Sequence, residues 1–125
     1  MYTEKVVKRF ENPRYAGELK DANAIGTVGN PACGDIMRLY MKINDETKVI
    51  EDVSFKTFGC AAAIASTDVA CELIKGKTID EALKITNKQV VDMLGTLPPQ
   101  KIHCSVLAEE SIDAAIKNYY EKKSK

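Results

Sequence analysis

The stretch DIMRLYMKINDETKVIEDVSFKTF, residues 35–58, decides the fold because it carries the pattern of two strands and of the turn that joins them. Apolar residues occupy every second position from Met37 to Ile43, and this period of two is typical of a strand with one buried face. The polar run at 44–48 predicts a turn, after which the strand pattern resumes over 49–58. We therefore predict an antiparallel hairpin.

The hairpin predicts which residues lie opposite one another at the end away from the turn. With the turn in the middle of the polar run, the numbers of paired residues add up to about 91 or 92. This register places Asp35 opposite residues 56–57 and Cys33 opposite residues 58–59, so that Cys60 lies beside Cys33. Cys33 and Asp35 are two positions apart in an extended segment, so their side chains share one face. Three candidate ligands therefore meet at this end.

The segments around the hairpin predict one further strand and several helices. AIGTVG (24–29) has the composition of a brief strand. Thr3 caps a short first helix, which the Asn12-Pro13 pair ends because the residue before proline is biased away from helix. The alanine-rich segment 59–76 predicts a longer helix.

Two short helices and a long one follow. TIDE (78–81) and TNKQ (86–89) both fit the capping box, and Gly95 closes the second of these helices. The long final helix begins within LPPQKIHCS (97–105). It is predicted by an apolar stripe at helical spacing, which consists of Ala108, Ile112, Ala115, Ile116 and Tyr119.

These elements predict an α+β fold with a hairpin, one further strand, about five helices and a candidate metal site at one end of the hairpin. The chain has 125 residues, 45% of them hydrophobic, which suits a single domain over residues 1–125. Lys plus Arg and Asp plus Glu number 18 each, so we expect neither nucleic acid nor a membrane surface as partner. The N-terminus lacks the features of a signal or transit peptide, which predicts a cytoplasmic protein.

The cysteines are the main carriers of chemistry in this sequence. None of the four is arranged as CxxC, so a shared site must be assembled from distant segments. Cys60 and Cys104 are each predicted near a helix N-terminus, which favours the thiolate form that binds metal or attacks sulfur. With a carboxylate and the single imidazole, His103, nearby, such thiolates would suit zinc or an iron-sulfur cluster.

Each of these interpretations has a simpler alternative. Cys71 shares an apolar stripe with Ile64 and Ile74, so we assign it to packing. Any other single cysteine could be an inert core residue, and Asp35 a solvated residue at a strand end. Nucleophilic catalysis by His103 with its neighbour Cys104 ranks low, because adjacent residues on a helix do not face each other.

Five blocks of the sequence also carry a resemblance to a known family. They are ENPRYAG (11–17), GNPACGD (29–35), FGCAAAIAS (58–66), GKTIDEAL (76–83) and LPPQKIHCSVLAEE (97–110). The chain resembles the U-type iron-sulfur cluster assembly scaffolds, which comprise the Isc-type scaffold and the N-terminal domain of the Nif-type scaffold. The resemblance runs almost from end to end, and the blocks occur in the order of the family.

The resemblance implies a three-stranded antiparallel sheet with about five helices packed against it and a metal site at one end of the sheet. It also implies a complete site and a role. It adds His103 and Cys104 to Cys33, Asp35 and Cys60 as ligands, and it makes the protein a scaffold without turnover of its own. A 2Fe-2S cluster is then built from iron and from persulfide sulfur that a cysteine desulfurase delivers to Cys104, with Asp35 serving iron entry and cluster lability. An electron donor such as a ferredoxin reduces the persulfide, and apo iron-sulfur proteins receive the cluster.

Two features leave alternatives open. The segment LPPQK (97–101) carries Gln100 where the Isc-type scaffold usually has Val, so docking of an Hsp70-type chaperone there stays open. Zinc could occupy the same ligands in the isolated protein, and a zinc-dependent sulfurtransferase of the Suf type is the alternative function. His103 and the absence of an evident insertion between the second and third site cysteines favour the scaffold. The sequence is compatible with a monomer or a cluster-bridged oligomer.

Overall fold

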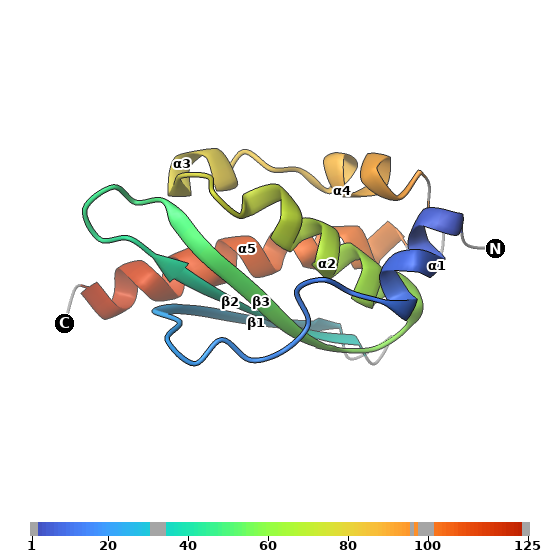
Figure 1. The fold of residues 1–125 in the computed structure, drawn as a ribbon, viewed down its shortest axis with the longest axis horizontal. Coiled ribbons are helices and arrows are strands. Elements are labelled where there is room, and N and C mark those ends of the chain that lie inside the picture. The colour runs from blue at the N-terminus through green and yellow to red at the C-terminus, as the bar shows by residue number, and fades with distance from the viewer. Residues whose placement is uncertain (1–2, 31–34, 96, 98–101, 124–125) are drawn as a thin grey trace.

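The computed structural model describes residues 3–30, 35–95, 97 and 102–123, and within them the chain is an α+β fold (Figure 1). This confirms the predicted class, with a three-stranded antiparallel sheet and five helices in the described ranges. The elements in chain order are α1 (Glu4–Glu11), β1 (Ala24–Asn30), β2 (Asp35–Ile43), β3 (Ile50–Phe58), α2 (Ala61–Ile74), α3 (Ile79–Ala82), α4 (Asn87–Leu94) and α5 (Ile102–Lys123).

The sheet has the order β1-β2-β3, and both neighbouring pairs are antiparallel. The predicted hairpin is therefore confirmed, but its predicted register is wrong. Ile36 pairs with Phe58 and Met37 with Thr57, so residues 56–57 do not lie opposite Asp35. The position predicted for Cys33 lies outside the described residues.

The register differs because the connection between β2 and β3 is longer than a tight turn. The amide N–H of Asn44 donates to the carbonyl of Val49 at 2.9 Å, and the amide N–H of Lys48 donates to the carbonyl of Asn44 at 2.8 Å. Lys48 has a φ of 62°, a left-handed conformation that is uncommon outside glycine. The pairing also shifts between Lys42 and Ile43, so strand partners fall later in β3 than a centred turn predicts.

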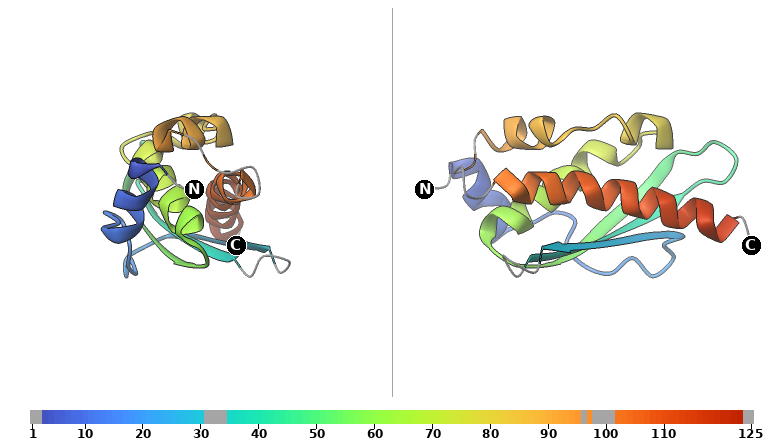
Figure 2. Two further views of the ribbon diagram at one scale, coloured as in Figure 1. Left: turned by 90° about the vertical axis from the view of Figure 1, so that its right-hand side faces the viewer. Right: turned by 180° about the vertical axis from the view of Figure 1, so that it is seen from behind.

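The helices cover one face of the sheet in two layers. Figures 1 and 2 show α2 and α5 lying against the sheet, α3 and α4 above them, and α1 at one end beside α2. The inward side chains of β2 are buried, as the alternating pattern predicted, and so is the predicted stripe of α5. At Gly26 the strand β1 touches α5 so closely that an added Cβ would lie 2.3 Å from the amide nitrogen of Ala115.

The helix ends match their sequence signals. Thr3 caps α1, and Thr78 and Thr86 each form the capping box that their sequences predicted. Gly95 ends α4 with a φ of 88°, a conformation that favours glycine.

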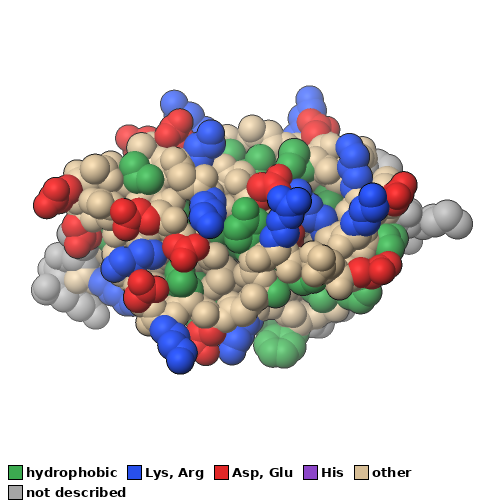
Figure 3. All heavy atoms as spheres, viewed as in Figure 1, with side chains coloured by type: hydrophobic (Ala, Val, Ile, Leu, Met, Phe, Trp, Pro, Cys, Tyr) green, Lys and Arg blue, Asp and Glu red, His purple; other side chains and the backbone are tan. Residues whose placement is uncertain are grey.

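The described helices show no candidate membrane span, since none of them combines the necessary length with sufficient apolar character. Figure 3 shows acidic and basic side chains interspersed over one face, in keeping with their equal numbers.

Candidate metal centre

Cys60 lies at the junction between β3 and α2, where the chain turns from strand to helix. Gly59, with a φ of 156°, makes this turn, and Cys60 takes the N-cap position of α2. Its backbone carbonyl accepts the amide N–H groups of Ala63 at 3.0 Å and Ile64 at 3.2 Å. No side-chain capping bond is made by Cys60, so its sulfur is not committed to closing the helix end.

The structure brings Cys104 to Cys60, although 44 positions separate them in the sequence. Cys104 lies in the first turn of α5, and its Sγ is 3.7 Å from the Sγ of Cys60. Cys104 is completely buried, whereas Cys60 is partly exposed. Both thiols therefore meet at the end of the sheet where α2 and α5 begin, with Cys60 on the solvent side.

The separation of the two sulfurs fits a shared metal ion. A disulfide would bring the sulfurs to about 2.0 Å. Two thiolates bound to one tetrahedral ion at about 2.3 Å each would lie about 3.8 Å apart. The observed 3.7 Å is close to this second value. The contact is that of a thiol hydrogen bond, and the spacing of Cys60 and Cys104 is also compatible with one shared metal ion.

The other predicted ligands are described only in part. The backbone of Asp35 begins β2, opposite Asn30 of β1, and the backbone of His103 precedes Cys104 in α5. Their side chains, and all of Cys33, lie outside the described part of the structure. In the described part, no group of three or more His, Cys, Asp or Glu residues could hold a metal ion. The five-residue ligand set therefore stays a prediction.

Cys71 belongs to a different environment. It is fully buried within α2 and packs in the hydrophobic core, as its place in the apolar stripe predicted. Burial, and secondarily the negative charge of Asp68, raise the pKa of the Cys71 thiol well above its usual value. Cys71 therefore stays a protonated thiol, unsuited to binding metal.

Apolar side chains are exposed beside Cys60, which the sequence patterns did not indicate. Ile36 and Phe58 are paired across β2 and β3, and they are 48% and 68% exposed. Phe58 also lines a small cavity of about 270 Å³ with Phe10 and Ile64. Only the strand alternation, which points residue 58 away from the core, could have signalled this exposure.

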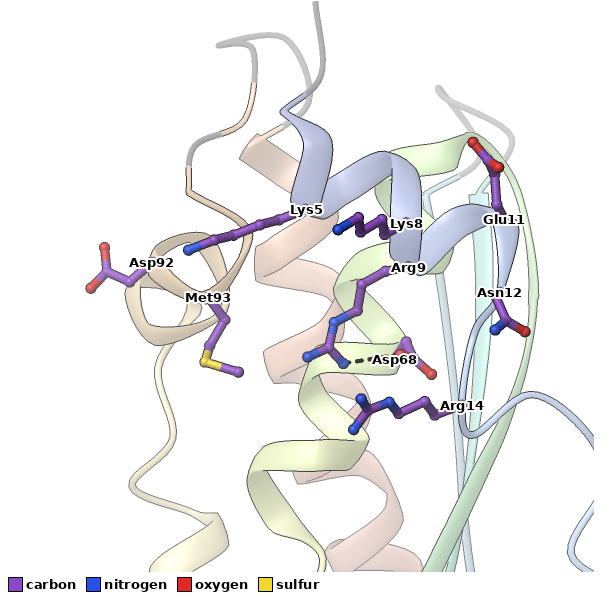
Figure 4. Close-up of a pocket in the computed structure, with 9 residues that line it drawn as sticks. All are labelled: Lys5, Lys8, Arg9, Glu11, Asn12, Arg14, Asp68, Asp92 and Met93. Carbon is purple, nitrogen blue, oxygen red and sulfur yellow. Dashed lines mark hydrogen bonds and ion pairs between the residues drawn. The ribbon is translucent and has the colours of Figure 1, made fainter.

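A second group that sequence reasoning missed attaches α1 to α2. Arg9 donates to the buried carboxylate of Asp68 at 3.0 Å and to Glu72 at 2.9 Å, and Asp68 also accepts the amide N–H of Tyr15. Arg9 and Asp68 border a surface cavity of about 650 Å³, in which Lys5 extends from α1 toward α4 (Figure 4). Because the carboxylate of Asp68 is neutralised within the fold, we assign this network to structure and not to ligand binding.

Comparison with known proteins gives consistent matches. The family model described as the NifU-like N-terminal domain matches residues 1–125. The iron-sulfur cluster assembly scaffold protein IscU 1 of Archaeoglobus fulgidus is 54% identical over 125 residues, which cover 100% of this chain and 80% of that protein. The scaffold protein IscU of Azotobacter vinelandii is 50% identical, covering 98% of this chain and 96% of its own length.

A solved structure matches the fold. The crystal structure of a candidate iron-sulfur cluster assembly scaffold protein for the SUF system, from Fervidobacterium islandicum, superposes with a TM-score of 0.79 at 25% identity. The match covers 92% of this chain and 96% of that one. The arrangement of sheet and helices is therefore shared with a protein of related description.

Proposed function

The chain belongs to the family of NifU-like N-terminal domains, and on this basis we propose that it assembles a 2Fe-2S cluster and transfers it to apo-proteins. The resemblance found in the sequence is thereby confirmed at the level of the family. The relatives described above are named as scaffold proteins, and the chain is accordingly a scaffold for iron-sulfur cluster assembly, not an enzyme.

The contact between Cys60 and Cys104 is the observation that supports this function most directly. Two thiols from different helices lie 3.7 Å apart at one end of the sheet, close to the spacing that one metal ion requires. We propose that Cys33, Asp35 and His103 complete the ligand set. Soft thiolates mixed with a harder carboxylate should hold a cluster less firmly than four thiolates, which suits a protein that must release its cargo.

The proposed sulfur route rests on the resemblance to the scaffold family. We propose that Cys104 accepts persulfide sulfur from a cysteine desulfurase, that iron enters by way of Asp35, and that an electron donor such as a ferredoxin reduces the sulfur to sulfide. Cys104 is completely buried, so the donor can reach it only if this end of the fold opens locally. We propose that the desulfurase docks on the exposed side chains of Ile36 and Phe58, which lie near Cys60 in the fold.

Other aspects of the proposal go beyond these contacts. Chaperone docking at LPPQK falls mostly on residues 98–101, which lie outside the described ranges. A cytoplasmic location, a single domain over residues 1–125, and a monomeric or cluster-bridged state stay predictions. A zinc-bound sulfur acceptor is the second candidate function, because zinc also fits the spacing of the two thiols.

Anaerobic reconstitution separates the two functions. The full chain is incubated with iron, cysteine and a cysteine desulfurase, and iron, sulfide, zinc and visible absorption are then measured. We expect iron and sulfide in equal amounts with a cluster spectrum, lost in Cys60→Ser and Cys104→Ser but kept in Cys71→Ser, the matched control. Stoichiometric zinc without a cluster would favour the sulfurtransferase.

A further inference from the structure

Two threonine hydroxyls link the end of β3 to the first turns of α2. The hydroxyl of Thr57 donates to Oγ1 of Thr67 at 3.2 Å, and the hydroxyl of Thr67 donates to the carbonyl of Ala63 at 2.8 Å. Thr67 and Ala63 are both fully buried. We infer that Thr67 is a positioning residue for Cys60, an inference that rests on the metal-binding role proposed above for this thiol.

The segment between Thr57 and Ala63 carries the thiol of Cys60. The segment 58–62 runs from the end of β3 through Gly59 and Cys60 into α2. One hydroxyl group, that of Thr67, is bonded to the residue before this segment and to the residue after it. Ala63 is already held by the backbone of α2, so the hydrogen bond from Thr57 to Thr67 is the hydroxyl contact that ties the start of this segment to the helix.

A threonine hydroxyl that bonds the carbonyl four residues earlier is common in helices and by itself implies no function. Thr67 differs because it also accepts a hydrogen bond from another element, β3. An apolar side chain of the same shape could fill this space, but apolar contacts have no preferred direction. A hydrogen bond has a preferred distance and angle, so the hydroxyl pair selects one position of α2 along its own axis.

The axial position of α2 matters because it sets the distance between the two sulfurs. The observed 3.7 Å is close to the sulfur–sulfur distance of two thiolates that bind one tetrahedral ion. Metal sites tolerate ligand displacements of about 0.2 Å, and functional sites as a whole of about 0.5 Å. A slide of α2 of that size would displace Cys60 from an ion that the two thiolates would share.

The variant Thr67→Val separates an effect on the position of Cys60 from an effect on folding. Thr67→Val keeps the shape of the side chain, and the carbonyl of Ala63 keeps its backbone partner within the helix. The hydroxyl of Thr57, which is only partly buried, can bond water instead. No buried group is left without a partner, so the unfolding temperature should change little. Thr67→Ser keeps the hydroxyl and removes only the methyl group.

Cobalt(II) titration of the metal-free full chain tests the inference. The thiolate-to-cobalt charge-transfer band reports both affinity and the number of bound sulfurs, and thermal unfolding is measured on the same samples. We expect Thr67→Val to weaken cobalt binding about tenfold at an unchanged unfolding temperature, with Thr57→Val similar. Thr67→Ser should stay within about twofold of the wild type. Ser66→Ala removes a neighbouring buried hydroxyl that makes no hydrogen bond in the described structure, and it should behave like the wild type.

Two results would overturn this inference but leave the proposed function intact. They are wild-type cobalt affinity in Thr67→Val and Thr57→Val, or an equal loss in Thr67→Ser, which would point to packing of the methyl group. In both cases Cys60→Ser would still lose charge-transfer intensity, so the proposed function would stand. A band of full intensity in Cys60→Ser would remove that thiol from the metal site and overturn the ligand assignment together with the inference.

Discussion

The two ends of the sheet, which lie on opposite sides of the molecule, are built differently (Figure 1). At the turn end, the hydroxyl of Tyr119 donates to Asp45 at 2.6 Å, and the ammonium of Lys48 donates to Tyr119 at 3.3 Å. At the other end, Cys60 and Cys104 lie 3.7 Å apart beside exposed apolar side chains. Polar contacts therefore fix α5 at its C-terminal end, whereas its N-terminal end presents groups suited to an exchangeable metal and a partner.

The largest expected effect lies at the turn end. Tyr119→Phe removes a hydrogen bond to a carboxylate and should lower the free energy of unfolding by about 1 to 2 kcal/mol. Cluster assembly should be unchanged, because the site is at the other end of α5. Chemical denaturation and the visible spectrum after reconstitution measure the two quantities. A variant that loses its cluster while keeping its stability would contradict the separation of the two ends.

At the cysteine end, Asp35→Ala should prolong the lifetime of the assembled cluster by about tenfold and slow its assembly or transfer, because the proposed site would lose its hard ligand. Decay of the cluster absorption in the presence of a chelator measures the lifetime. Loss of the cluster at the wild-type rate would remove Asp35 from the site. Asp45→Ala, a carboxylate change at the turn end, serves as the matched control.

Cys71 belongs to neither end, and its raised pKa predicts a dependence of stability on alkaline pH. Below the usual thiol pKa of 9.0 both folded and unfolded chains keep the proton, so this group does not alter stability there. Above that pH only the unfolded chain loses the proton, and the free energy of unfolding should fall by up to about 1.4 kcal/mol per pH unit. Denaturation between pH 8 and pH 10 should show a shallower fall in Cys71→Val; identical slopes would exclude this thiol as the cause.

The smallest effect on stability is expected at the exposed apolar pair. Phe58→Ser should change the free energy of unfolding by less than about 0.5 kcal/mol, because the side chain is 68% exposed. Affinity for the cysteine desulfurase should nevertheless fall about fivefold or more. Titration of the desulfurase with labelled protein measures this, and Leu83→Ser, an exposed apolar residue on another face, provides the control. Equal affinities of Phe58→Ser and the wild type would place the docking surface elsewhere.

Much of the fold could be predicted because its signals are local. The alternation from Met37 to Ile43 and the stripe of α5 each follow from one element and one buried face. The capping boxes at Thr78 and Thr86 depend on residues three positions apart. The strand register failed because it depends on the conformation of the turn, where Lys48 takes a left-handed φ that its residue type does not indicate.

The site could be predicted only in part, because it joins residues from distant segments and local signals do not relate them. The sequence marked Cys60 and Cys104 separately, each by its position near the start of a helix. No periodic pattern relates α2 to α5, so the contact between the two cysteines could be found only in the three-dimensional structure. The link from Thr57 to Thr67 was hidden because each threonine fits a strand or a helix without further explanation. The ion pair of Arg9 with Asp68 joins elements 59 positions apart, and charge alone does not choose among such partners.

The burial of Cys104 also decides which molecules in a cell could remove sulfur from it. A sulfur atom carried on an exposed cysteine would be open to attack by any small thiol, since thiol exchange depends on access as well as on thiolate content. Cys104 is completely buried, so sulfur bound there would be shielded from such thiols until the end of the fold opens. If Cys104 accepts sulfur as proposed, the same packing would keep that sulfur from being lost before iron arrives.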